Sequence, residues 1–97
     1  MITKTYSTAT SGTVTLLDTK QDQMCIHNAG SLAATLTITM PPNPIDGQCV
    51  MISSTLGVTA LTMSSAITLV GALTVIAAAG YATYIYESTA NKWFRVG

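Results

Sequence analysis

Few side chains in this 97-residue sequence have the chemistry that catalysis requires. The single histidine, His27, stands beside Asn28 at the end of an expected strand, and we interpret it as a hydrogen-bonded surface residue. The acids are scattered through expected turns, and no serine, histidine and acid share a recognisable local arrangement. We therefore expect no catalytic residue, no cofactor site and no enzymatic activity. The four acids are Asp18, Asp22, Asp46 and Glu87.

The two cysteines, Cys25 and Cys49, form no C-x-x-C motif and no Cys/His cluster. The favoured interpretation is two free thiols buried as small apolar side chains. A disulfide between them is the alternative, because both lie in expected strands that can be neighbours. Structural zinc sites use four Cys or His ligands, whereas this chain has 2 Cys and 1 His, so we expect no metal site.

An aromatic strip near the C-terminus is a candidate binding element. Tyr84 and Tyr86 share one face of an expected strand, and Trp93 lies on the strand that returns beside it. Aromatic rings stack on sugars, but Tyr and Trp are also common anchors of cores and protein interfaces. We interpret these three residues as core or subunit-interface side chains, with a carbohydrate platform as the alternative.

The strongest turn signal lies between residues 41 and 47, with the sequence PPNPIDG. Its prolines remove backbone donors and hold the preceding residues extended. Gly47 supplies a positive φ without steric cost, and Asp46 can bond to nearby backbone. We therefore assign Pro41, Pro44, Asp46 and Gly47 a structural role.

Alternation of period two on both sides of this turn predicts β-strands. Residues 34–40 alternate threonine with apolar side chains, whereas residues 48–53 are apolar on both faces and are expected to be buried. No helical period is present, and strands recur about every 10 residues. Hairpins are expected between residues 23–27 and 34–40 and between 81–87 and 92–96. The remaining expected strands cover residues 13–17, 48–53, 58–63, 67–70 and 73–76.

These strands predict one all-β domain over residues 12–97, a small antiparallel β-sandwich of jelly-roll type. Residues 1–11 are polar, and we expect them to form an extended arm that becomes ordered only against a neighbour, through Ile2 and Tyr6. Several expected strands carry apolar or Thr side chains on both faces. A second buried surface, supplied by an oligomer, is therefore expected outside the core of one chain.

Charge is sparse throughout the chain. Charged residues make up 8% of the sequence and the net charge is zero, which favours self-association or docking on a larger body. No basic patch is present to bind phosphates, so we expect no nucleic-acid partner. Residues 47–86 carry no charge, but Thr and Ser recur through them and argue against a membrane helix. No signal peptide is evident in residues 1–11, so we expect synthesis in a cytoplasm.

The PPNPIDGQCVMI segment, the Thr/Ser/Gly-rich run after it and the terminal KWFRVG resemble a small β module of bacteriophage fibre and head-surface proteins. Residues 1–34 have no counterpart in that module. The matching positions are Pro41, Pro44, Asp46, Gly47, Gln48, Val50, Ile52, Tyr86, Trp93 and Arg95.

The resemblance implies a virion structural protein made in the cytoplasm of a bacterial host. It implies a homotrimer that acts as a capsid decoration or cement protein, bound to the major capsid protein or to another virion protein. A tail fibre or spike component is the alternative from the same resemblance. A carbohydrate-binding module is the alternative from another class.

Overall fold

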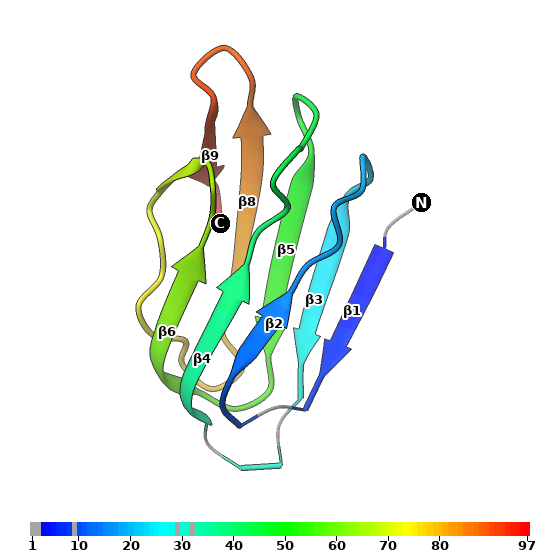
Figure 1. Cartoon of the computed structure of the whole chain (residues 1–97). Coiled ribbons are helices and arrows are strands. Elements are labelled where there is room, and N and C mark those ends of the chain that lie inside the picture. Colours follow the sequence, from blue (N-terminus) through cyan, green and yellow to red (C-terminus); the bar gives the residue numbers. More distant parts are fainter. Residues whose placement is uncertain (1–2, 9, 29, 32) are drawn as a thin grey trace.

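The structure, a computed structural model, describes residues 3–8, 10–28, 30–31 and 33–97 (Figure 1). Its regular elements in these ranges are all β-strands, which confirms the all-β class. The strands predicted over residues 23–27 and 81–87 have the predicted bounds, and the bounds of most other predicted strands differ by one or two residues. The strands are β1 Thr3–Ser7, β2 Thr13–Thr15, β3 Gln23–His27, β4 Ala33–Thr39, β5 Cys49–Ser54, β6 Val58–Ser64, β7 Thr68–Val70, β8 Tyr81–Glu87 and β9 Lys92–Arg95.

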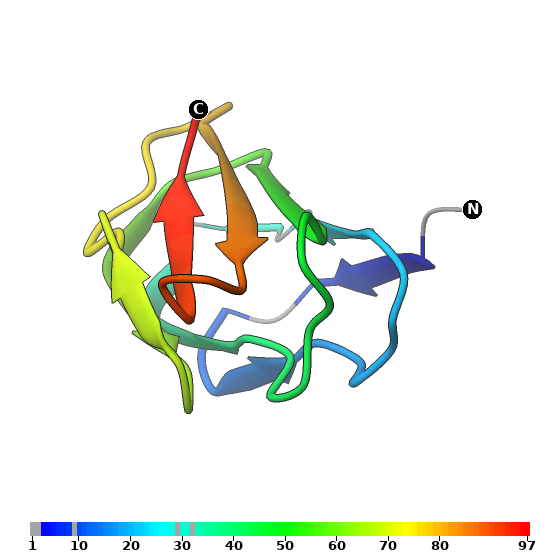
Figure 2. The same cartoon turned by 90° about the horizontal axis from the view of Figure 1, so that it is seen from above.

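The first six strands alternate between two sheets. Strands β1, β3 and β5 belong to a six-stranded sheet with the order β1-β3-β5-β8-β9-β7, and β2, β4 and β6 form a three-stranded sheet. Each strand pairs in parallel with the next strand of its own sheet. The chain therefore winds as in a β-solenoid, with one strand of every coil in each sheet. Figure 2 shows the sheets on opposite sides of the space that the core side chains fill.

The expected antiparallel jelly roll is wrong. Among the described strands, five of the seven pairings are parallel, and only β5–β8 and β8–β9 are antiparallel. The expected hairpin between residues 23–27 and 34–40 is also wrong, because β3 and β4 lie in different sheets. Alternation along a strand reports which face is buried, but it is the same for parallel and antiparallel partners. The connection between the strands decides the partner.

The predicted C-terminal hairpin is present and interrupts the solenoid winding. Strands β8 and β9 pair in antiparallel fashion and lie between β5 and β7, and β7 pairs in parallel with β9. The strand predicted over residues 73–76 is reduced to one antiparallel bridge between Ile76 and Val58. A further hydrogen bond from Leu61 N to Thr74 O, 2.8 Å long, holds this segment beside β6. The segment thus extends the three-stranded sheet without forming a full strand.

The core lies between the two sheets and contains the inward side chains of both. Trp93 and Tyr84 are its largest fully buried residues, and Tyr86 is 8% exposed. Trp93 and Tyr86 pack edge to face, with ring centroids 5.6 Å apart. Fully burying one large apolar side chain stabilises the fold by about 1.5 to 3 kcal/mol. The interpretation of these aromatic residues as core is confirmed within a single chain.

His27 is not the surface residue that we expected. It is 1% exposed, and its Nδ1 lies 3.1 Å from Ser54 Oγ. β3 and β5 pair in register at these two residues, so the imidazole and the hydroxyl meet inside the molecule at the end of neighbouring strands. His27 is therefore hydrogen-bonded, as expected, but its partner lies in the interior and not at the surface.

The N-terminal segment is part of the six-stranded sheet. Strand β1 pairs with β3 from Thr3↔Gln23 to Ser7↔His27, so the expectation that this segment becomes ordered only against another subunit is wrong. A parallel partner within the same chain supplies the backbone hydrogen bonds that we expected from a neighbour. The division of the chain at residue 11 stays a prediction.

Candidate functional site

The outer side of the six-stranded sheet carries a cluster of apolar side chains, here called the apolar face. Each of these side chains is half-buried and alternates with inward residues such as Val50 and Tyr84. The strand register aligns them in rows, with Met24 opposite Met51 and Ile85 between Cys49 and Phe94. None of them is charged. The apolar face consists of Met24, Ile26, Cys49, Met51, Ile85 and Phe94.

Exposed apolar and aromatic residues extend this face toward its edges. Tyr6 is 56% exposed opposite Ile26, and Tyr81 is 71% exposed opposite Ser53. Val70, opposite Phe94, is 41% exposed. Charged residues surround this face: Lys4 on β1, Asp22 beside Cys49, and Glu87 and Lys92 at the β8–β9 turn. A contiguous apolar surface with a polar rim is typical of a protein interaction site.

The opposite side of the molecule has a different chemistry, and we call it the hydroxyl face. Parallel pairing aligns Thr13, Thr37 and Thr62 in one row across the three-stranded sheet. A second row contains Thr15, Thr39 and Ser64. Strands β2, β4 and β6 contain no Lys, Arg, Asp or Glu. The two outer faces are therefore both uncharged in their centres, but one is apolar and the other is covered with hydroxyl groups.

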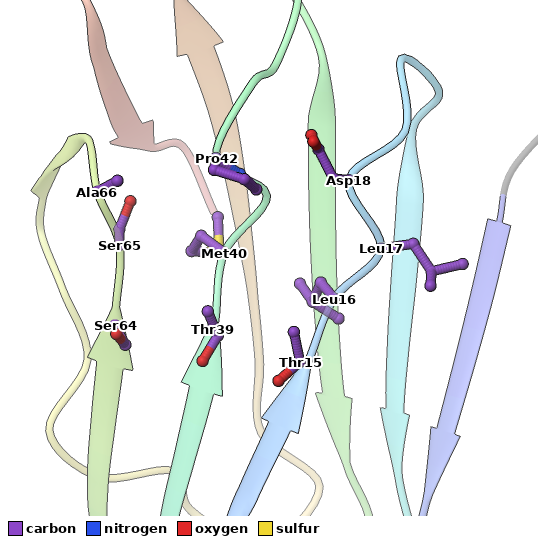
Figure 3. Close-up of a pocket in the computed structure, with 10 residues that line it drawn as sticks. All are labelled: Thr15, Leu16, Leu17, Asp18, Thr39, Met40, Pro42, Ser64, Ser65 and Ala66. Atoms are coloured by element: carbon purple, nitrogen blue, oxygen red, sulfur yellow. The ribbon is translucent and has the colours of Figure 1, made fainter.

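A pocket of about 530 Å³ lies where β2, β4 and β6 end (Figure 3). Its walls come from the ends of these strands and the segments that follow them. Ser65 and Ala66 point toward Met40 and Pro42 from one side, and Asp18 points toward them from the other. The sheet hydrogen bonding continues into this region, because the amide of Met40 donates to Ser64 O at 2.8 Å.

Two buried glutamines fix the loops beside the pocket. Gln23 Nε2 donates to Leu17 O at 2.5 Å, and the amide of Leu17 donates to Gln23 Oε1 at 3.1 Å. Gln48 Nε2 donates to Thr19 O at 2.9 Å, and its Oε1 accepts from the amide of Ile45 at 3.1 Å. Because both glutamine side chains are nearly inaccessible, these bonds satisfy side-chain amide groups that would otherwise be buried without partners.

A second set of contacts joins the two loops to each other. Asn43 Nδ2 donates to Asp18 Oδ2 at 3.0 Å, and Lys20 Nζ donates to Asn43 O. Asp22 Oδ1 accepts from the amide of Cys49 at 2.9 Å. The loop after β2 and the loop after β4 are thus held against one another, and the pocket is formed in advance of any ligand.

The aromatic residues proposed as binding residues do not form a surface. Tyr84 and Trp93 are 0% exposed, and Tyr86 is largely buried. The hydroxyl groups of the two tyrosines bond to the chain itself: Tyr84 Oη donates to Gly71 O at 3.2 Å, and Tyr86 Oη donates to Asn91 Oδ1 at 2.6 Å. These three residues therefore cannot offer a ring face to a sugar or to another subunit.

Of the two residues proposed as contacts of the N-terminal arm, the structure describes only Tyr6. Ile2 lies outside the described residues. Tyr6 is exposed on the edge strand β1, where its hydroxyl accepts a hydrogen bond from Asn28 Nδ2 at 2.8 Å. Tyr6 thus remains available to a partner at the edge of the apolar face.

The turn between residues 41 and 47 connects two parts of the fold. Gly47 has the positive φ expected from the sequence, 80°, and its amide donates to Tyr86 O at 2.8 Å. Asp46 Oδ1 accepts from the amide of Ser88 at 2.9 Å. Pro41 is buried and Pro44 is half-buried. The turn therefore packs against the β8–β9 hairpin as well as joining β4 to β5.

Both cysteines are free, but only Cys25 is also buried as the favoured interpretation stated, and Cys49 is half-buried. Cys25 faces the core, and burial raises the pKa of its thiol to about 11. Cys49 belongs to the apolar face, where partial burial, followed by the negative charge of Asp22, raises the pKa of its thiol. The disulfide alternative does not hold, because the two side chains point to opposite sides of the six-stranded sheet.

Within the described ranges, no three His, Cys, Asp or Glu side chains are grouped so that they could hold a metal ion. The part of the chain that the structure describes also has no helix long and apolar enough to cross a membrane. Comparisons with family models, with curated proteins and with solved structures find no match.

The sequence analysis expected a second apolar surface outside the core but did not assign its residues, and it did not identify the pocket. The sequence pattern that indicated the apolar face is segment 48–53, whose apolar residues lie on both sides of one strand. The pocket has no such signal, because it depends on the ends of three strands that the parallel register brings together.

Proposed function

We propose that this chain is a non-enzymatic structural subunit of a bacteriophage virion, a capsid decoration or cement protein that binds to the head surface as a homotrimer. The observation that carries the proposal is the apolar face. Six apolar side chains without a charge among them cover the centre of the larger sheet, and burial of such a surface is the main driving force of protein association.

A trimer accommodates both outer faces of the subunit. Three copies arranged around a common axis bury three apolar faces against one another and leave the hydroxyl faces in contact with water. The net charge of zero removes long-range repulsion between copies. Closed rotational symmetry also limits the assembly to a defined size.

The second partner is the major capsid protein or another virion protein. The resemblance to head-surface modules supports this partner, and the edge strands β1 and β2 offer a means of contact. An edge strand presents backbone groups to which an extended segment of another protein can pair. Exposed Tyr6 on β1 gives that segment an aromatic anchor.

The oligomer is tested by light scattering on the purified chain, which should give a mass near three times 10.1 kDa. Met51→Glu places a charge in the centre of the apolar face and should produce monomers. Thr37→Glu places the same charge on the hydroxyl face and should leave the trimer intact. A monomeric native chain, or dissociation by Thr37→Glu alone, contradicts the proposed interface.

The location is tested by negative-stain imaging of virions labelled with an antibody against this chain. Label distributed over the head supports a decoration or cement protein. Label confined to the tail supports the alternative, a fibre or spike component, which is based on the same resemblance. Absence of label from virions that are shown to carry their other proteins contradicts both.

A further inference from the structure

We infer that the pocket at the ends of β2, β4 and β6 binds a neutral sugar residue. It is a different place from the aromatic strip, whose rings are buried. The pocket volume of about 530 Å³ lies within the usual range for small-ligand sites, which is about 300 to 1,000 Å³. The inference concerns the single subunit and is independent of the proposed virion role.

The polar groups of the pocket suit a ligand with several hydroxyl groups. Asp18 is exposed, and its Oδ2 accepts a hydrogen bond from Asn43 Nδ2 at 3.0 Å, which orients the carboxylate. A carboxylate accepts strong hydrogen bonds from hydroxyl donors. On the opposite wall, Ser65 Oγ accepts from the amide of Ile67 at 3.1 Å, so that its proton is available to a ligand oxygen. Figure 3 shows Ser65 on one side of Met40 and Pro42, and Asp18 on the other.

The apolar groups suit the C–H face of a sugar ring. Leu16, Met40, Pro42 and Ala66 belong to the apolar part of the lining. Most of a small ligand's contact surface is apolar in sites of this kind, and a few polar groups fix its orientation. Because the buried amides of Gln23 and Gln48 hold the loops, little ordering is needed when a ligand binds.

Other classes of ligand fit this lining less well. The lining contains no Lys, Arg or His, and the charge of Asp18 repels phosphates and acidic sugars. It contains no aromatic ring to stack on a nucleobase or to hold a quaternary amine. A purely apolar ligand would remove water from Asp18 without replacing its hydrogen bonds, which is costly.

The test is an NMR titration of the labelled, full-length chain with the methyl glycosides of glucose, galactose, mannose and N-acetylglucosamine, each added separately. At least one should shift the amide signals of residues 15–18, 40 and 64–66, and glucuronic acid should bind more weakly. Asp18→Asn should weaken binding about tenfold or more, because a charged hydrogen-bond acceptor is lost. Ala66→Phe should abolish binding by filling the pocket.

Glu87→Gln, which removes a carboxylate at the β8–β9 turn, is the matched control and should leave the affinity unchanged. Thermal unfolding of each variant shows whether it is folded. If Asp18→Asn is unfolded, the binding measured with Ala66→Phe tests the site. The inference is overturned if none of the four glycosides shifts these signals, if the shifts fall elsewhere, or if glucuronic acid binds as tightly as the neutral sugars.

Discussion

The carboxylate of Asp46 accepts a hydrogen bond from the backbone amide of Ser88, 42 residues further along the chain and 2.9 Å away. One residue later, the amide of Gly47 donates to the carbonyl of Tyr86. The turn before β5 is thereby joined to the end of β8, the strand that pairs with β5 in antiparallel fashion. These bonds hold in place the hairpin that separates β5 from β7.

Replacing Gly47 with valine should therefore lower the free energy of unfolding. The φ of 80° is disfavoured for a β-branched residue, and we expect a loss of about 1 to 3 kcal/mol. A Cβ at this position meets no atom within 4 Å, so the cost comes from the backbone conformation and not from a clash. Urea unfolding measures the loss. Gly30→Val is the matched control, since Gly30 also has open space but lies outside the left-handed region; equal losses in both variants would contradict the argument.

Replacing Trp93 with alanine should cost about 3 to 5 kcal/mol, because the indole is fully buried between the sheets. The same position predicts blue-shifted tryptophan emission in the native protein. Tyr81→Ala provides the comparison, since Tyr81 is 71% exposed and its truncation should change the monomer's stability little. Native emission at the wavelength of free tryptophan would show that Trp93 is not in the core.

The local structure of this chain could be predicted from its sequence to a large extent. Alternation placed Gln23–His27 and Tyr81–Glu87 correctly, and the glycine of the PPNPIDG turn has the expected φ. These features depend on residues that are close in the sequence. Alternation is a property of one strand, and a positive φ is a property of one residue.

The arrangement of the strands could not be predicted in the same way. The choice between a hairpin and a crossing to the other sheet depends on the connection after His27, and the sequence there was compatible with a tight turn. His27 itself was misplaced, because its partner Ser54 is 27 residues away. The pocket likewise depends on the register of three strands. Non-local pairing of this kind leaves no periodic signal in a single sequence.

The stability contributed by Cys25 should depend on pH. Its thiol ionises near pH 9.0 in an exposed setting, whereas burial raises its pKa in the folded chain to about 11. Between these values the unfolded chain releases a proton that the folded chain retains. The contribution is therefore complete below pH 9 and falls as pH rises toward 11, by about 2 to 3 kcal/mol.

Urea unfolding of the native chain and of Cys25→Ala at several pH values between 8 and 11 measures this effect. The difference between their free energies of unfolding should shrink as the pH rises, because titrations of Tyr and Lys are common to both chains and cancel. A difference that stays constant over this range would show that the Cys25 thiol is not protected by burial.

Deletion of residues 1–8 should destabilise the fold, because it removes β1 from the edge of the six-stranded sheet. The loss includes the pairing with β3 and the bonds from Asn28 to Ser7 O, 2.7 Å, and to the Tyr6 hydroxyl. Each kcal/mol lost should lower the melting temperature by about 4 to 8 °C for a domain of this size. The deletion also makes β3 an edge strand, and its sequence QMCIH has no Lys or acid to oppose pairing with other chains. We therefore expect light scattering to show larger aggregates than the native chain forms.

Tyr6→Phe is the control for the deletion, since it removes only the hydroxyl that Asn28 contacts and should change the melting temperature little. The two possible roles of the segment give opposite results. A truncated chain that melts at the native temperature and remains dispersed would show that residues 3–7 do not pair with β3 in solution, and that the segment acts as an arm. A lower melting temperature together with aggregation would establish β1 as a strand that protects the edge of β3.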